Sequence, residues 1–151
     1  MYFGNEIIRR HGVVAVVPRP LTASKPAESE REYLVIERSQ TVIAPGRLCF
    51  PGGGIESGET AEQAVLREFR EEVQGEIAVI RPIWENVTPW HVHLLWYLGE
   101  LTDPTALLTA SPDEVASLRW MTIREMRSAP AFLESNHPFL EKVLQGVIIL
   151  E

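Results

Sequence analysis

The sequence has little of several features that would define its class at once. It has one cysteine, Cys49, so no internal disulfide can form. It has no basic excess, and its net charge of −7 argues against a nucleic-acid duplex or an anionic membrane as the main partner. The apolar run at 13–17 is too short to span a membrane. These absences predict a cytoplasmic protein. An acidic protein can still bind phosphorylated ligands if metal ions supply the positive charge.

The sequence does contain the pattern of a single α/β domain over 1–151, with 45% hydrophobic residues. Helices packed on a sheet are expected. The segment 33–38 is expected to run antiparallel to the first strand, and 18–31 and most of 39–58 to form loops. The expected strands are 13–17, 33–38, 77–84, 92–101 and 118–121, with a short extended piece at 48–50, and the expected helices begin at Thr60, Thr122 and Pro138.

The most informative stretch is 53–72, where a glycine-rich loop leads directly into an acidic helix. Thr60 and Gln63 form a capping box, which predicts a helix over 60–73. At about 100° per residue, apolar side chains share one arc, and the acids share another with alanines, which should leave open space. The apolar arc contains Val65, Leu66, Phe69 and Val73, and the acidic arc contains Glu68, Glu71, Glu72, Ala61 and Ala64.

Local helix stability does not explain these glutamates. Glu68 is i,i+3 to Glu71 and i,i+4 to Glu72, and each like-charge pair costs roughly 0.2–0.5 kcal/mol. A bound Mg²⁺ or Mn²⁺ would explain them, because both ions prefer oxygen ligands. The alternative is a solvated acidic face paired with Arg67 and Arg70. The glycines before the helix favour the metal, since they let the backbone approach a ligand closely.

Loop and helix together resemble the Nudix box, G-x5-E-x7-R-E-U-x-E-E-x-G-U, in which U is a bulky aliphatic residue. The pattern is long, its spacing is fixed, and it is preceded by a Phe-Pro-Gly sequence at 50–52 that also looks like the family. The matching residues are Gly53, Glu59, Arg67, Glu68, Glu71 and Glu72. Phe69 is aromatic instead of aliphatic, and Gln74 replaces the second glycine, which appears one place later. We therefore expect Gly75 to be the left-handed cap of the helix.

The resemblance implies a Nudix-type α/β/α sandwich with a mixed β-sheet between helices. It also implies metal-dependent hydrolysis of a nucleoside diphosphate linked to another group X, or of a related pyrophosphate. Arg67 is expected to orient the acids together with Glu56 and Glu59. The implied metal ligands are Glu68, Glu71, Glu72 and the backbone carbonyl of Gly52 or Gly53, and the implied catalytic residues are Glu68, Glu71, Arg67 and Glu114.

The resemblance leaves the general base open between a box glutamate and an acid far along the chain. Glu114, in SPDEVASLRW, is the first distant candidate, ahead of Asp113 and Glu85, and its alternative role is a surface acid. Gly53 and Trp90 are the candidate substrate contacts, Trp90 by stacking on a base. Trp96 and Trp120 are expected in the core. His91 and His93 have the spacing of one strand face, where polar packing, ligand contact and metal binding all remain open.

Two other functions remain as alternatives. One is a non-catalytic Nudix-fold domain that senses a nucleotide, which loss of box glutamates would favour, and none is lost. The other is isomerase chemistry on an allylic diphosphate, which needs an essential cysteine, whereas the ordinary role of Cys49 is a small buried residue. The substrate lies outside what the box specifies, and a homodimer is open.

Overall fold

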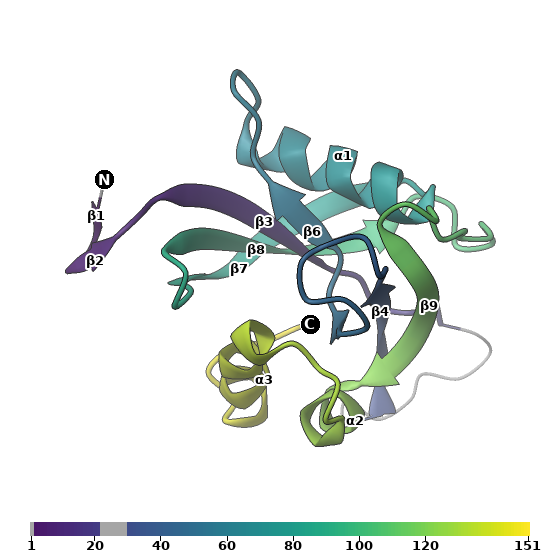
Figure 1. Ribbon diagram of the computed structural model, residues 1–151. Coiled ribbons are helices and arrows are strands. Elements are labelled where there is room, and N and C mark those ends of the chain that lie inside the picture. Colours follow the sequence, from purple (N-terminus) through teal and green to yellow (C-terminus); the bar gives the residue numbers. More distant parts are fainter. Residues whose placement is uncertain (1, 22–29) are drawn as a thin grey trace.

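The computed structural model describes residues 2–21 and 30–151, and its elements form three layers (Figure 1). Strands lie between α1 on one side and α2 and α3 on the other, which confirms the expected α/β/α sandwich. The strands are β1 (Tyr2–Phe3), β2 (Glu6–Ile7), β3 (Arg10–Val16), β4 (Glu32–Arg38), β5 (Leu48–Cys49), β6 (Gly52–Gly54), β7 (Ile77–Val87), β8 (Val92–Leu101) and β9 (Val115–Thr122). The helices are α1 (Ala61–Val73), α2 (Ile123–Ser128), the 3₁₀ turn η2 (Glu134–Asn136) and α3 (His137–Leu144).

Two sheets make up the middle layer. The first, in the order β6-β3-β8-β7, is mixed, because β3 runs parallel to β8 while the other pairs are antiparallel. The second, in the order β5-β4-β9, is antiparallel. The expected antiparallel course of 33–38 relative to the first strand is confirmed only at one end, where Pro18 and Tyr33 form an antiparallel bridge. Both edges of β3 are taken by β6 and β8, so β4 meets the chain after β3 only locally, where the Leu34 amide donates to the Val17 carbonyl at 2.9 Å.

The strand β3 is covered on both faces, which explains its continuous apolar sequence. Val13 packs in the hydrophobic cluster on the α1 side, and Val14 and Val16 pack in the cluster on the side of α2 and α3. On that second side, Trp96 of β8 stacks on Phe139 of α3, with ring centroids 4.4 Å apart. Such an aromatic pair adds about 0.5–1.5 kcal/mol beyond its burial and fixes α3 against the sheet.

The helix α1 begins as predicted and ends differently. Thr60 Oγ1 accepts from the Gln63 amide at 3.1 Å, and Gln63 Oε1 accepts from the Thr60 amide at 2.9 Å. The left-handed residue at the end is Gln74, with φ 53°, so the prediction that Gly75 is the cap is wrong. Gly75 provides space instead, because a Cβ there would lie 2.4 Å from Leu108 Cδ2.

Most other elements lie where the sequence predicts them. The expected strands at 77–84, 92–101 and 118–121 are confirmed as parts of β7, β8 and β9, and the helices at Thr122 and Pro138 as α2 and α3. The strand β6 was missed, since its three glycines were assigned to a loop. The expected loop at 18–31 falls largely on 22–29, outside the described residues. Within the described ranges, no helix is long and apolar enough to cross a membrane.

Candidate active site

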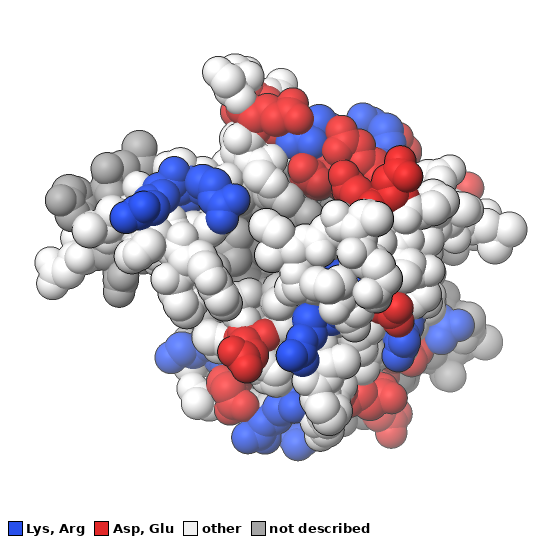
Figure 2. Space-filling view, viewed as in Figure 1, with Lys and Arg blue, Asp and Glu red and all other residues white. Residues whose placement is uncertain are grey.

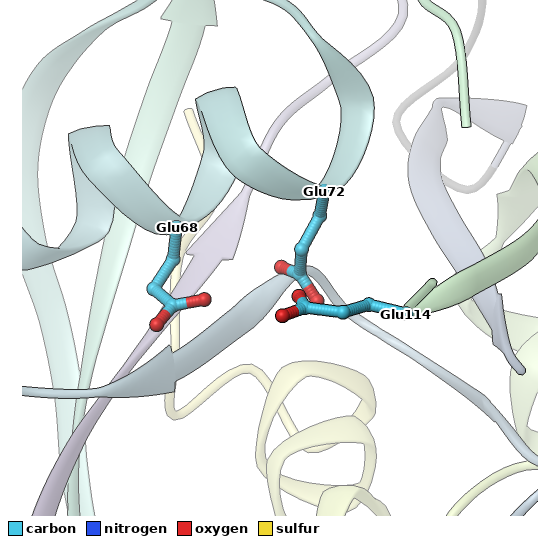
Figure 3. A group of neighbouring side chains, drawn as sticks. All are labelled: Glu68, Glu72 and Glu114. Atoms are coloured by element: carbon cyan, nitrogen blue, oxygen red, sulfur yellow. The ribbon is translucent and has the colours of Figure 1, made fainter. Parts of the chain in front are cut away.

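Three glutamates from two distant segments meet at the edge of α1 (Figure 3). Glu68 and Glu72 come from successive turns of α1, and Glu114 reaches toward them from the segment just before β9. Each offers one carboxylate oxygen, and these three oxygens all lie within 4.8 Å of one another. Oxygen ligands of this kind are those that Mg²⁺ and Mn²⁺ prefer, so the donor set fits such an ion.

Backbone hydrogen bonds hold the distant segment against α1. The Thr109 amide donates to the Val73 carbonyl at 3.0 Å, and the Ser111 amide donates to the Glu72 carbonyl at 2.9 Å. Both carbonyls belong to the last turn of the helix, where no intrahelical partner is available to them. Capping the helix therefore also positions Glu114.

Burial makes Glu72 the most unusual of the acids. Its side chain is 5% exposed, and the amide of Gly52 donates to its Oε1 at 2.8 Å. Burial raises the pKa of Glu72 well above the usual value, and the neighbouring Glu68 and Glu114 raise it further against the effect of the Gly52 hydrogen bond. Burial also raises the pKa of Glu68, although Arg67 opposes the shift. A divalent cation would supply the positive charge that the ionised group needs.

Glycine, and not alanine, makes room for the acids. Ala64 is fully buried, so the expected open space beside the alanines is absent and that prediction is wrong. The acidic side of α1 lies against β6, where a Cβ on Gly53 would be 2.3 Å from Glu68 Cδ. Helix and strand can approach this closely only because β6 has no side chains.

Arg67 organises the acids beside the cluster. Its guanidinium donates to both Glu59 oxygens at 2.6 and 3.0 Å, to Glu68 at 2.9 Å and to Glu71 at 3.1 Å. These hydrogen bonds lower the pKa of Glu59 to about 2. Glu56 lies 3.6 Å away, as expected for a partner of Arg67. Glu71 is half exposed and pairs with Arg67, so the structure does not bring it into the group formed by the other three glutamates.

A cavity of about 390 Å³ lies beside the cluster. Gly53 lines it from β6, and Trp90, which is 61% exposed, lines it from the β7–β8 turn. Asn136 and Arg38 are among the lining residues that were not identified from the sequence. Asn136 is buried, and its Oδ1 accepts a hydrogen bond from the Phe50 amide at 3.2 Å. Arg38 is the last residue of β4. Their only sequence signals are an arginine at the end of an apolar strand and an asparagine before the proline of α3.

The surface around this region is divided by charge. Acidic side chains gather over α1 and the loop before it, and basic side chains gather on the projecting start of β3, where Arg9 and Arg10 are exposed (Figure 2). Arg10 also lines the cavity. The lining of the cavity thus takes its formal charges from Arg10 and Arg38, both of them basic, and the acidic side chains over α1 lie outside it.

The other residues considered in the sequence analysis lie outside the group of three glutamates. His91 lies before β8 with a positive φ of 62° and contacts the Ile7 carbonyl, so the prediction that it shares a strand face with His93 is wrong. Asp113 uses its carbonyl to hold Ser39, and Glu85 contacts His93. Cys49 is buried, and burial raises its pKa to about 11, which keeps the thiol protonated. Trp96 is in the core as expected, while Trp120 is only partly buried.

Two curated relatives match part of this chain. The 8-oxo-dGTP diphosphatase of Escherichia coli (strain K12) is 50% identical over 63 residues, which is 42% of this chain and 40% of that protein. The NAD-capped RNA hydrolase NudC of Pseudomonas putida (strain W619) is 31% identical over 80 residues, which is 52% of this chain and 28% of that protein. Each match thus spans less than half of the relative.

Structure comparison extends the likeness over nearly the whole chain. The MutT protein from Methanosarcina mazei Go1 superposes with a TM-score of 0.71 over 94% of this chain and 97% of that one, and 17% sequence identity makes this a likeness of fold. The family model described as the NUDIX domain matches residues 19–143. With the box residues, the sandwich fold and this match in agreement, the chain belongs to the Nudix family.

Proposed function

We propose that the chain, as one domain over 1–151, is a metal-dependent pyrophosphohydrolase that cleaves a nucleoside diphosphate linked to another group X. The observation that carries the proposal is the convergence of Glu68, Glu72 and Glu114 beside a cavity, with one of them buried. Clustered acids of this kind raise the free energy of the empty site and favour a cation. No box glutamate is replaced, which supports hydrolysis over nucleotide sensing alone.

The proposed ion is Mg²⁺ or Mn²⁺, held by Glu68 and Glu72 of the group, while Glu71, which is paired with Arg67, and the Gly52 carbonyl are the further ligands that the box implies. When bound, such an ion shields the pyrophosphate charge and lowers the pKa of the attacking water. Glu114 is our choice for the general base, because it faces the box glutamates from a separate segment. Arg67 keeps Glu68 and Glu71 in place through its hydrogen bonds.

The cavity is proposed to hold the nucleoside. Trp90 offers an exposed aromatic face on which a base can stack, and the Asn136 amide group can donate to a base carbonyl while its Oδ1 holds Phe50. The relatives above are named for 8-oxo-dGTP and NAD-capped RNA, and both contain a nucleoside next to a phosphoric anhydride. We accordingly propose that the partner is a nucleotide and not a nucleic-acid duplex or a membrane. We also propose that the protein is cytoplasmic, and the choice between a monomer and a homodimer is left open.

A substrate panel tests this proposal. Incubation with ADP-ribose, oxidised nucleoside triphosphates, dinucleoside polyphosphates and coenzyme A should release phosphate or nucleotide products from at least one compound when Mg²⁺ or Mn²⁺ is present. Excess EDTA should abolish the reaction, and addition of the ion should restore it. Tight binding of a nucleotide without any product would favour the sensing domain instead.

Replacing Trp90 by alanine should raise KM about tenfold and leave kcat nearly unchanged. Stacking of a base on an aromatic ring contributes roughly 1–3 kcal/mol, and it holds substrate and transition state equally. Steady-state kinetics on the best panel substrate give both constants. Trp90→Phe retains a stacking face and should stay within about threefold of the parent. A loss confined to kcat would place Trp90 outside substrate binding.

A further inference from the structure

A pair of histidines, with a glutamate behind one of them, crosses the first sheet. His11 of β3 and His93 of β8 are register partners in the parallel pair, and Glu85 lies on β7 next to β8. The Nδ1 atoms of the two imidazoles are 3.1 Å apart, and their rings are nearly perpendicular, at 81°. Three adjacent strands thus each contribute one member of the group.

Glu85 determines which nitrogen of His93 carries the proton. Its Oε2 lies 2.9 Å from His93 Nε2. A carboxylate can only accept, so Nε2 carries a proton, and in the tautomer without a second proton the Nδ1 lone pair of His93 is directed toward His11. A carboxylate behind a histidine is also the arrangement that orients imidazole ligands in metal sites.

The distance between the imidazoles matches a shared ion. Two metal–nitrogen bonds of about 2.0–2.1 Å that meet at roughly 100° place the nitrogens about 3.1 Å apart. The same distance suits an N–H···N hydrogen bond in the metal-free protein. An ion can therefore take the place of the shared proton at the same nitrogen–nitrogen distance, with a rotation of the rings that turns both lone pairs toward it.

We propose that His11 and His93 bind one divalent transition-metal ion, such as Zn²⁺, Ni²⁺ or Co²⁺, through their Nδ1 atoms, with Glu85 orienting His93. Imidazole nitrogens suit these ions, whereas Mg²⁺ and Ca²⁺ favour oxygen, so this site differs in chemistry from the acidic cluster. Water would complete the coordination, and the Glu85 side chain behind His93 is 46% exposed. The ion would tie β3 to β8, and β3 in turn carries β6 with its glycines.

The test uses the full chain with Glu72→Gln, in excess Mg²⁺, so that the acidic cluster does not compete for the probe. A calorimetric titration with Zn²⁺ should give one bound ion. A thermal melt with Zn²⁺ should give a raised Tm, because the ion binds the folded state. In NMR spectra that detect imidazole nitrogens, the Nδ1 signals of His11 and His93 should shift, while those of His91 and His137 stay in place. Absence of a bound ion, or shifts at the other two histidines only, would overturn the proposal.

Matched variants locate the ligands. His11→Gln and His93→Gln should each weaken Zn²⁺ binding at least tenfold, and Glu85→Ala should weaken it about 10–100-fold. His91→Asn, which suits the positive φ at that position, should bind like the parent. Unchanged affinity in the His93 and Glu85 variants would refute the site. Circular dichroism checks folding, and the exposed Glu85 variant decides the outcome if a histidine variant unfolds. Because the probe is metal binding, the result is independent of hydrolysis.

Discussion

Glu72→Gln is expected to lower kcat/KM about 10³-fold and, at the same time, to stabilise the metal-free protein at pH 8. The activity loss follows from removing a charged ligand at the centre of the acidic cluster, where metal-ion catalysis contributes several kcal/mol. The stabilisation follows from burial, because glutamine keeps the hydrogen bond from the Gly52 amide and removes a buried charge. An increase on the order of 1–3 kcal/mol in the free energy of unfolding is expected.

The sign of the pH dependence follows from the raised pKa of Glu72. A carboxyl whose pKa is higher in the folded than in the unfolded state stabilises the fold below the unfolded value of about 4.3. That contribution is lost as the pH rises through the folded value. The metal-free parent should therefore lose stability as the pH rises from about 4.3 through the folded value, and Glu72→Gln should remove this part of the slope.

Urea unfolding in EDTA at pH 5 and at pH 8 measures the effect on stability. Initial rates in Mg²⁺ measure the effect on activity. Glu62→Gln is the matched control, because Glu62 is an exposed acid in the first turn of the same helix. It should change neither the rate nor the slope noticeably. Retained activity in Glu72→Gln, or an unchanged slope, would contradict the assignment of Glu72 as a buried metal ligand.

Gly53→Ala is expected to lower kcat about 10²-fold while the protein still folds. The added Cβ would lie 2.3 Å from Glu68 Cδ, so the carboxylate must move. A displacement of about 1 Å in a catalytic group can cost two orders of magnitude in rate. Kinetics in saturating Mn²⁺, together with a thermal melt, separate this effect from unfolding.

Gly54→Ala provides the comparison on the same strand. A Cβ at Gly54 meets nothing within 4 Å, and its φ lies outside the left-handed region. Its rate should stay within about threefold of the parent, since an ordinary surface substitution changes stability by about 0.5 kcal/mol or less. Equal losses in the two variants would mean that any side chain on β6 is harmful, and that the contact with Glu68 is not the cause.

Local signals in the sequence predicted the elements best. The capping box of Thr60 and Gln63 gave the start of α1, because the interacting groups are three residues apart. The spacing of the box gave Glu68 and Glu72 as neighbours for the same reason. The position of Glu114 was anticipated from the resemblance alone, and the bonds from Thr109 and Ser111 that place it are visible only in the fold.

Contacts between segments that are distant in the chain could not be predicted from the sequence. The glycines of β6 look like a loop until β3, some 40 residues earlier in the chain, provides a partner strand. His93 was grouped with His91 by spacing, but its partner is His11, 82 residues away. The burial of Glu72 is of the same kind, because a helical wheel gives the direction of a side chain and not what covers it.

The division of surface charge bears on how fast a ligand arrives. In a chain of net charge −7, the acidic face over α1 creates a field that repels a free polyphosphate over about one Debye length, about 8 Å at physiological salt. A nucleotide that already carries its divalent ion is less repelled, and Arg9 and Arg10 attract its remaining negative charge from the start of β3. Encounter therefore favours the ion-complexed nucleotide approaching from the β3 side, and added salt should reduce that preference.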